Sequence, residues 1–120
     1  MGVRLDPDQR EQYLERLAAV LDEARIQRRT LTYLEVADAL AMPGPQRIHK
    51  TTRLLEILLK HDAEAGRPLR AALAVSRTGQ GLPAAGFFDR ARRLGLVDRE
   101  THEAFHRRVL QQLFHGAGAD

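Results

Sequence analysis

The residues best spaced for chemistry lie near the end of the chain. Residues 102–106, His-Glu-Ala-Phe-His, match the H-E-x-x-H pattern, in which two histidines one helical turn apart bind zinc and the glutamate activates a water molecule. A catalytic zinc also needs a third protein ligand, and downstream there are only His115 and Asp120. Val109 and Gln112 stand where the longer version of the pattern has glycine and histidine. We therefore interpret the motif as incidental and expect no metal site.

Other catalytic signals are missing from the sequence. The chain has no cysteine, which excludes disulfides, thiolate zinc sites and a cysteine nucleophile and is compatible with a reducing cytoplasm. We find no catalytic triad, P-loop or dinucleotide-binding loop, and no apolar stretch approaches the roughly 20 residues of a membrane span. The N-terminus lacks the pattern of a signal peptide. We expect a cytoplasmic protein that is not an enzyme, has no cofactor and does not enter a membrane.

Positive charge is concentrated in two middle blocks of the sequence. The formal net charge is only +3, but residues 25–53 carry six basic and two acidic side chains, and residues 66–99 carry seven and two. Seventeen of the nineteen cations are arginine, whose planar guanidinium suits phosphates and base edges better than the ammonium of lysine. This distribution favours a nucleic-acid partner, whereas the bland alternative is the arginine bias of a GC-rich genome on solvated helix faces.

The elements that must position these residues are mostly helices. Apolar spacing and capping signals predict five of them, beginning after Asp6, at Thr32, at Pro45, after Pro83 and at Asp98. Leu34 and Ile48 are expected to face the core with the other apolar residues of the second and third helices. Residues 69–76 alternate in polarity and predict a strand, and the glycine-containing turn 77–81 closes a short hairpin.

The predicted fold is mainly α with a small β-hairpin. It forms a single domain over residues 1–115, with a frayed tail at 116–120. Three helices, a short hairpin and two further C-terminal helices follow the order of a winged helix-turn-helix, in which the third helix usually enters the major groove and the hairpin reaches the backbone. Domains of this kind also serve as protein-interaction modules, so that alternative stays open.

Residues 31–48 resemble, without a gap, the helix-turn-helix of the alkylguanine-DNA alkyltransferases and their alkyltransferase-like relatives. The family pattern is a Ser/Thr-Tyr pair opening the second helix, an alanine inside it, a proline in the turn and an arginine four residues later. The matching residues here are Thr32, Tyr33, Ala37, Pro43 and Arg47. The resemblance implies that Tyr33 helps rotate a nucleotide out of the duplex and that Arg47 fills the vacated space. A packing role for Tyr33 and a solvated Arg47 are the alternative.

The likeness covers roughly residues 30–95 and includes the family's Val-x-x-x-Gly hairpin at residues 75–79. It fails at the transferase motif Pro-Cys-His-Arg just before that hairpin, because residues 70–73 read Arg-Ala-Ala-Leu. Alkyl transfer is therefore excluded. The His-Arg that alkyltransferase-like proteins keep is also absent, which leaves recognition of damaged DNA outside what the resemblance implies.

Together these signals predict a non-enzymatic DNA-binding protein of winged-helix type that binds double-stranded DNA. The alternative is a protein-interaction or structural module that has a protein partner and does not bind DNA. The residues expected to contact DNA lie in the helix-turn-helix and near the wing, where cations meet phosphates and polar side chains reach bases. They are Tyr33, Gln46, Arg47, His49, Lys50, Arg53, Arg70 and Arg77.

Overall fold

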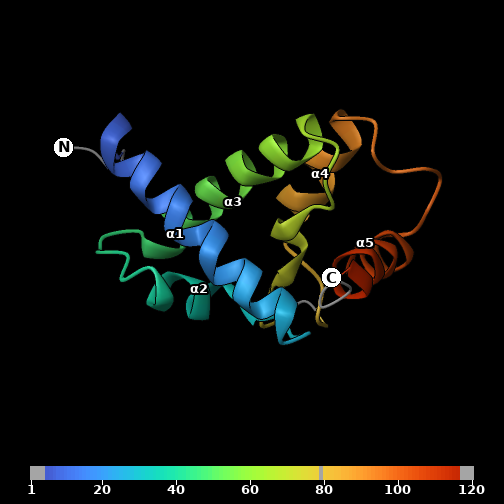
Figure 1. The fold of residues 1–120 in the computed structure, drawn as a ribbon, viewed down its shortest axis with the longest axis horizontal. Coiled ribbons are helices and arrows are strands. Elements are labelled where there is room, and N and C mark those ends of the chain that lie inside the picture. The colour runs from blue at the N-terminus through green and yellow to red at the C-terminus, as the bar shows by residue number, and fades with distance from the viewer. Residues whose placement is uncertain (1–4, 79, 117–120) are drawn as a thin grey trace.

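The structure is a computed structural model that describes residues 5–78 and 80–116 (Figure 1). Over these residues it contains α1 (Pro7–Ile26), α2 (Tyr33–Ala39), α3 (Arg47–Glu64), α4 (Ala85–Arg93) and α5 (His102–Gly116). The short elements are a 3-10 helix η1 (Arg70–Leu73) and the strands β1 (Leu31–Thr32) and β2 (Ala74–Val75). The predicted mainly α fold is confirmed, and none of these helices is both long and apolar enough to cross a membrane.

Capping boxes begin the first two helices; the sequence predicts the one at Thr32, and at Asp6 it predicts a cap but not the reciprocal bond from Gln9. At α1, Gln9 N–H donates to the Asp6 carboxylate over 2.8 Å, and Pro7 needs no hydrogen bond at the first helical position. At α2, Glu35 N–H donates to the Thr32 hydroxyl over 3.1 Å, and the Glu35 carboxylate accepts from Thr32 N–H over 2.8 Å. Both starts depend on residues three positions apart, which is why a local pattern identifies them.

The connection between α2 and α3 uses two residues in the left-handed backbone region. Ala41 (φ 51°) ends α2 and Gln46 (φ 61°) precedes α3, so the helical path cannot run through either residue. The third helix therefore begins at Arg47 and not at the predicted Pro45. This backbone brings the first turn of α3 back beside α2, against which it packs.

The predicted hairpin is wrong. Arg70–Leu73 form a 3-10 helix, and only Ala74–Val75 are extended, pairing in parallel with Leu31–Thr32. The alternating pattern of residues 69–76 had predicted a strand with one exposed face. Residues 71–75 are instead buried on every side, because this segment passes through the core between α1, α3 and α5. After β2, Ser76 N–H donates to the Leu82 carbonyl over 2.8 Å and closes a turn, and no strand follows within residues 80–116.

The last two helices complete the core. α4 buries Phe87, Phe88 and Ala91, while α5 buries Phe105, Val109 and Leu113. The cap of α5 is Thr101 and not the predicted Asp98, because Arg99 has a left-handed backbone (φ 53°) and Ala104 N–H donates to the Thr101 hydroxyl over 3.1 Å. The buried side chains of all five helices form one contiguous cluster with η1.

Candidate nucleic-acid interface

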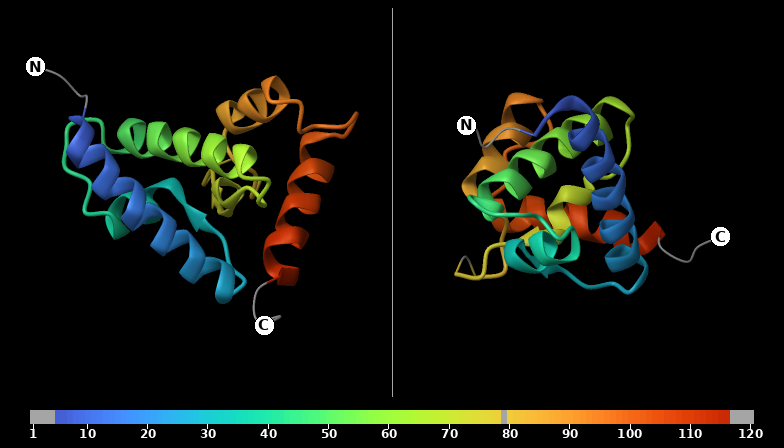
Figure 2. Two further views of the ribbon diagram at one scale, coloured as in Figure 1. Left: turned by 45° about the horizontal axis from the view of Figure 1, so that its top comes forward. Right: turned by 90° about the vertical axis from the view of Figure 1, so that its left-hand side faces the viewer.

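A groove between α1 and α3 gathers basic side chains. Arg10 from α1 lies there with His49, Lys50 and Arg53 from α3, over an apolar floor that includes Ile57. The groove has a volume of about 370 Å³, and none of the described residues that line it is an aspartate or a glutamate. The two helices can supply its walls because their N-terminal ends lie side by side (Figure 2). Three of the predicted DNA contacts are thus brought together.

The cations of this groove are largely free to meet a ligand. The side chains of Arg10, His49 and Arg53 are exposed and have no hydrogen-bond or ion-pair partner in the described part of the chain. Lys50 donates to the Pro43 carbonyl over 3.1 Å, a bond that water can replace. Gln46 is exposed just before α3 and makes no capping hydrogen bond with its side chain. The amide and the cations therefore lie along one exposed side of the helix.

Arg47 is held within the protein. Its Nη2 lies 2.6 Å from the Asp38 carboxylate at the end of α2, and its Nε donates to the Met42 carbonyl over 2.8 Å. These contacts fix the turn between α2 and α3. The intercalating role that the resemblance implies for Arg47 would require both contacts to break.

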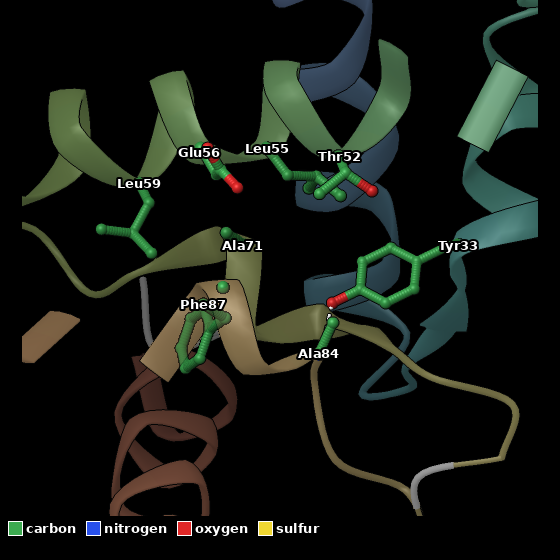
Figure 3. Close-up of a pocket in the computed structure, with 9 residues that line it drawn as sticks. Tyr33, Thr52, Leu55, Glu56, Leu59, Ala71, Ala84 and Phe87 are labelled. Atoms are coloured by element: carbon green, nitrogen blue, oxygen red, sulfur yellow. Dashed lines mark hydrogen bonds between the residues drawn. The ribbon is translucent and has the colours of Figure 1, made fainter. Parts of the chain in front are cut away.

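Tyr33 lies partly buried beside a narrow pocket between α2, α3 and the start of α4. Its hydroxyl accepts a hydrogen bond from Ala84 N–H over 2.7 Å (Figure 3). Burial raises the pKa of the Tyr33 phenol above its ordinary value, and the nearby charge of Glu56 adds to the rise, while the bond from Ala84 opposes it. The first residue of α2 is thereby tied to the N-terminus of α4, which agrees with the packing alternative.

The pocket beside Tyr33 has a volume of only about 20 Å³, enough for about one water molecule. Ala71 lines it, at the position where the family pattern has its cysteine (Figure 3). A nucleobase turned out of a duplex would need a far larger cavity than this one. With no thiol and no room for a base, the pocket offers neither the nucleophile nor the substrate space for alkyl transfer.

Glu56 links the wall of this pocket to α4. Its carboxylate accepts from Arg90 Nη2 over 3.2 Å, and a Cβ at Gly86 would lie 3.2 Å from its other oxygen. The negative charge therefore sits against the first turn of α4, where the free backbone N–H groups favour it. Ala84, the N-cap, has no side chain that could cap this helix. Glu56 and Tyr33 together hold the N-terminus of α4.

Arg70, which the sequence predicted to contact a phosphate, is paired with two carboxylates of the protein itself. Its backbone N–H and Nε both donate to one oxygen of Asp62 over 3.1 Å, and Nη2 donates to the other over 2.8 Å. Nη1 lies 3.2 Å from Asp22, and the side chain is only 14% exposed. The hydrogen bonds to Asp62 raise the pKa of Arg70 further. Asp62 lies on the same side of α3 as the buried leucines of that helix. Its helical spacing could therefore have indicated a buried carboxylate that needs a basic partner such as Arg70.

Arg77 lies on the other side of α3 from the basic groove. It is exposed and shares a groove of about 430 Å³ with Leu34 and Ile48. These two apolar side chains are 44% and 41% exposed, so the prediction that they face the core is wrong. They occupy the first turns of α2 and α3 and line one groove at the surface, and apolar spacing cannot distinguish such a position from a core position.

The two histidines of the H-E-x-x-H pattern have structural contacts. His106 is 4% exposed, and its Nε2 lies 2.8 Å from the Ala72 carbonyl, so this nitrogen carries the proton and donates. Burial lowers the pKa of His106. The His102 ring stacks on Phe88 with centroids 3.9 Å apart. Among the described residues, no three His, Asp or Glu side chains are grouped to hold a metal ion.

Neither family models, curated proteins nor solved structures provide a match to this chain. Function must therefore be inferred from the residues themselves. His49, Lys50 and Arg53 share one side of α3 and Gln46 is exposed just before it, while the other predicted contacts are held internally or lie across the helix. The sequence interpretation missed Arg10, because only the fold brings an otherwise acidic helix end beside α3.

Proposed function

We propose that the protein binds double-stranded DNA through the groove between α1 and α3 and performs no covalent chemistry. The observation that carries this proposal is the set of four basic side chains, Arg10, His49, Lys50 and Arg53, around a groove without a carboxylate. Cations that release counterions from phosphates supply most of the affinity of a protein for duplex DNA. An uncompensated cationic groove is the surface that this mechanism needs.

The identity of the helix supports duplex DNA in particular. α3 is the second helix of a helix-turn-helix order, and such helices enter a groove with their N-terminal residues toward the bases. Gln46 offers an amide there, and His49 and Arg53 follow one turn apart. The resemblance of residues 31–48 to an alkyltransferase helix-turn-helix points the same way. The small volume of the pocket at Tyr33 and the missing cysteine support binding without catalysis.

A fluorescence-anisotropy titration of a random-sequence duplex at several salt concentrations tests this proposal. Three permanent cations, Arg10, Lys50 and Arg53, predict a slope of log affinity against log salt of about −3 and non-specific dissociation constants of roughly 1–100 μM. The variant Lys50→Gln/Arg53→Gln should flatten the slope to about −1. Arg10→Gln should flatten it by about one unit and tests the residue that the sequence did not reveal.

Arg107→Gln is the matched control, because Arg107 is an exposed arginine on α5, away from the N-terminal ends of α1 and α3 (Figure 2). Its slope should equal that of the unaltered protein. Absence of binding at low salt would refute the proposal. Equal losses in Arg10→Gln and in this control, each of which removes one positive charge, would also refute it, since binding would then depend on total charge alone.

A second candidate function is recognition of a protein partner through Leu34 and Ile48. The exposed apolar pair lies in a groove flanked by Arg77 and Glu35, which a partner could cover with an apolar side chain and an acidic or amide neighbour. Leu34→Ser/Ile48→Ser separates the two functions. Two results would favour this second candidate. Leu34→Ser/Ile48→Ser should keep its DNA affinity, and it should lose a cross-linked partner that the control Arg107→Gln retains.

A further inference from the structure

We propose that a cluster of arginines at the C-terminal end of α1 binds a small-molecule oxyanion, a phosphate or a carboxylate. The cluster surrounds a cavity of about 200 Å³ whose lining comes from α1, α5 and the segment between α3 and η1. The lining residues are Asp22, Arg25, Arg67, Pro68, Arg70 and Leu113. None of them belongs to the proposed DNA groove.

The charges of this cluster do not cancel. Three guanidinium groups, from Arg25, Arg67 and Arg70, face two carboxylates, from Asp22 and Asp62. Arg70 uses its donors on both carboxylates, with three bonds to Asp62 and one contact to Asp22. One positive charge is therefore left over at the cavity.

Arg25 and Arg67 retain unused hydrogen-bond donors. Each approaches a carboxylate only to 3.6 Å, through Nε, which is beyond hydrogen-bond length. Arg25 Nε is shielded from solvent and has no hydrogen-bond acceptor within the described residues, so an anion would reach Arg25 through the Nη groups at the end of its side chain, which is 32% exposed. The Arg67 side chain is 58% exposed. An anion with two or three oxygens can accept from both guanidinium groups, which forms the strongest class of hydrogen bonds that arginine makes.

The cavity also limits the affinity and the size of the ligand. Pro68 and Leu113 form an apolar wall, which suits an anion with a short aliphatic or ester part. Arg25 and Leu113 belong to the last turns of α1 and α5, whose free carbonyls oppose an anion. We therefore expect half-saturation at roughly 1–10 mM, within the range of weak small-ligand binding.

This site is separate from the groove that we propose for DNA. Arg10 and Arg25 are fifteen residues apart on one helix, which corresponds to roughly 22 Å along its axis. Loss of one function would therefore leave the other intact. The oxyanion proposal does not depend on whether the protein binds DNA.

A titration followed by NMR tests the oxyanion site. Inorganic phosphate and, separately, acetate are added to about 100 mM, ten times the highest expected dissociation constant, while chloride keeps the ionic strength constant, and the arginine Nε–Hε cross-peaks are recorded. The cross-peaks of Arg25 and Arg67 should shift and saturate. At ten times the dissociation constant, the Tm should rise by roughly 5 °C. A response to phosphate alone identifies phosphates as the ligand class, and a response to acetate identifies carboxylates.

Arg67→Met should abolish both responses, and Arg93→Met, at an exposed arginine of α4, should leave them unchanged. The comparison separates binding from the general stabilisation that phosphate gives to folded proteins. Unmoved cross-peaks with both anions, or an equal response in Arg67→Met, would overturn the proposal. Retained DNA affinity in Arg67→Met would confirm that the two surfaces are independent.

Discussion

Removal of the Asp62 carboxylate should be among the most damaging single changes in this fold. Asp62 is fully buried and accepts from the backbone N–H, Nε and Nη2 of Arg70. The variant Asp62→Ala leaves that guanidinium with only Asp22, through its Nη1. A cation that loses its partner inside a protein keeps the cost of leaving water and loses the compensating attraction.

The expected cost can be placed within a narrow range. Breaking a buried ion pair by removing one partner typically costs about 3–5 kcal/mol. The lower end applies here, because Arg70 is 14% exposed and can turn toward water, and because its contact with Asp22 remains. We therefore expect the free energy of unfolding to fall by about 3 kcal/mol, and the Tm by roughly 12 °C for a chain of this length.

Urea denaturation followed by circular dichroism measures this change. Asp38→Ala is the control, because Asp38 forms an ion pair with Arg47 at the protein surface and its loss should cost less than about 1 kcal/mol. A second variant, Asp62→Leu/Arg70→Met, removes both charges and should recover most of the lost stability. Together with the single variants Asp62→Leu and Arg70→Met and the unaltered protein, this double variant completes a double-mutant cycle that isolates the coupling between Asp62 and Arg70.

Two results would refute this reasoning. If Asp62→Ala costs no more than the surface control, the Arg70 charge does not need its partner. If Asp62→Leu/Arg70→Met is as unstable as Asp62→Ala, the cost comes from lost shape or hydrogen bonding around residue 62 and not from an unpaired charge.

Three further predictions concern single buried groups. Tyr33→Phe should cost about 1–2 kcal/mol in urea denaturation, since Ala84 N–H loses its acceptor, and an unchanged stability would mean that water replaces the hydroxyl. Thr51→Val should be neutral or stabilising by up to about 1 kcal/mol, because the Thr51 hydroxyl is buried and has no hydrogen-bond partner among residues 5–78 and 80–116; a clear loss would reveal a hidden bond. Burial lowers the pKa of His106, so the unfolded chain takes up a proton more readily than the folded protein. Stability should therefore fall as the pH drops below about 6.5, and Tm measurements at pH 7.5 and 5.5 should show a smaller fall in His106→Gln.

Features that depend on neighbouring residues were predictable from the sequence. The predicted cap at Asp6 and the predicted capping box at Thr32 involve partners three residues away, and both are present. The predicted strand failed because apolar alternation does not reveal that residues 71–75 are enclosed on all sides. Arg70 was assigned to a phosphate because its partners, Asp62 and Asp22, are brought to it only by the packing of α1 and α3.

The same distinction applies to the candidate site. His49, Lys50 and Arg53 follow one another on a single helix, and helical spacing alone predicts that they share a surface. Arg10 is about forty residues away from them in sequence and joins their groove only because the helix ends meet. Contacts within an element could be predicted, whereas contacts between elements required the fold.

The two sides of α3 bear differently on function. On the side toward α4, Tyr33 and Glu56 are committed to holding a neighbouring helix, and Ala71 lines a space for about one water molecule. On the side toward α1, basic side chains remain exposed and uncompensated. A reaction on a base would require more room than the small pocket beside Tyr33 offers, and the chain has no thiol to act as its nucleophile. Attraction to phosphates requires only the side that is already open, which is why we favour binding without catalysis.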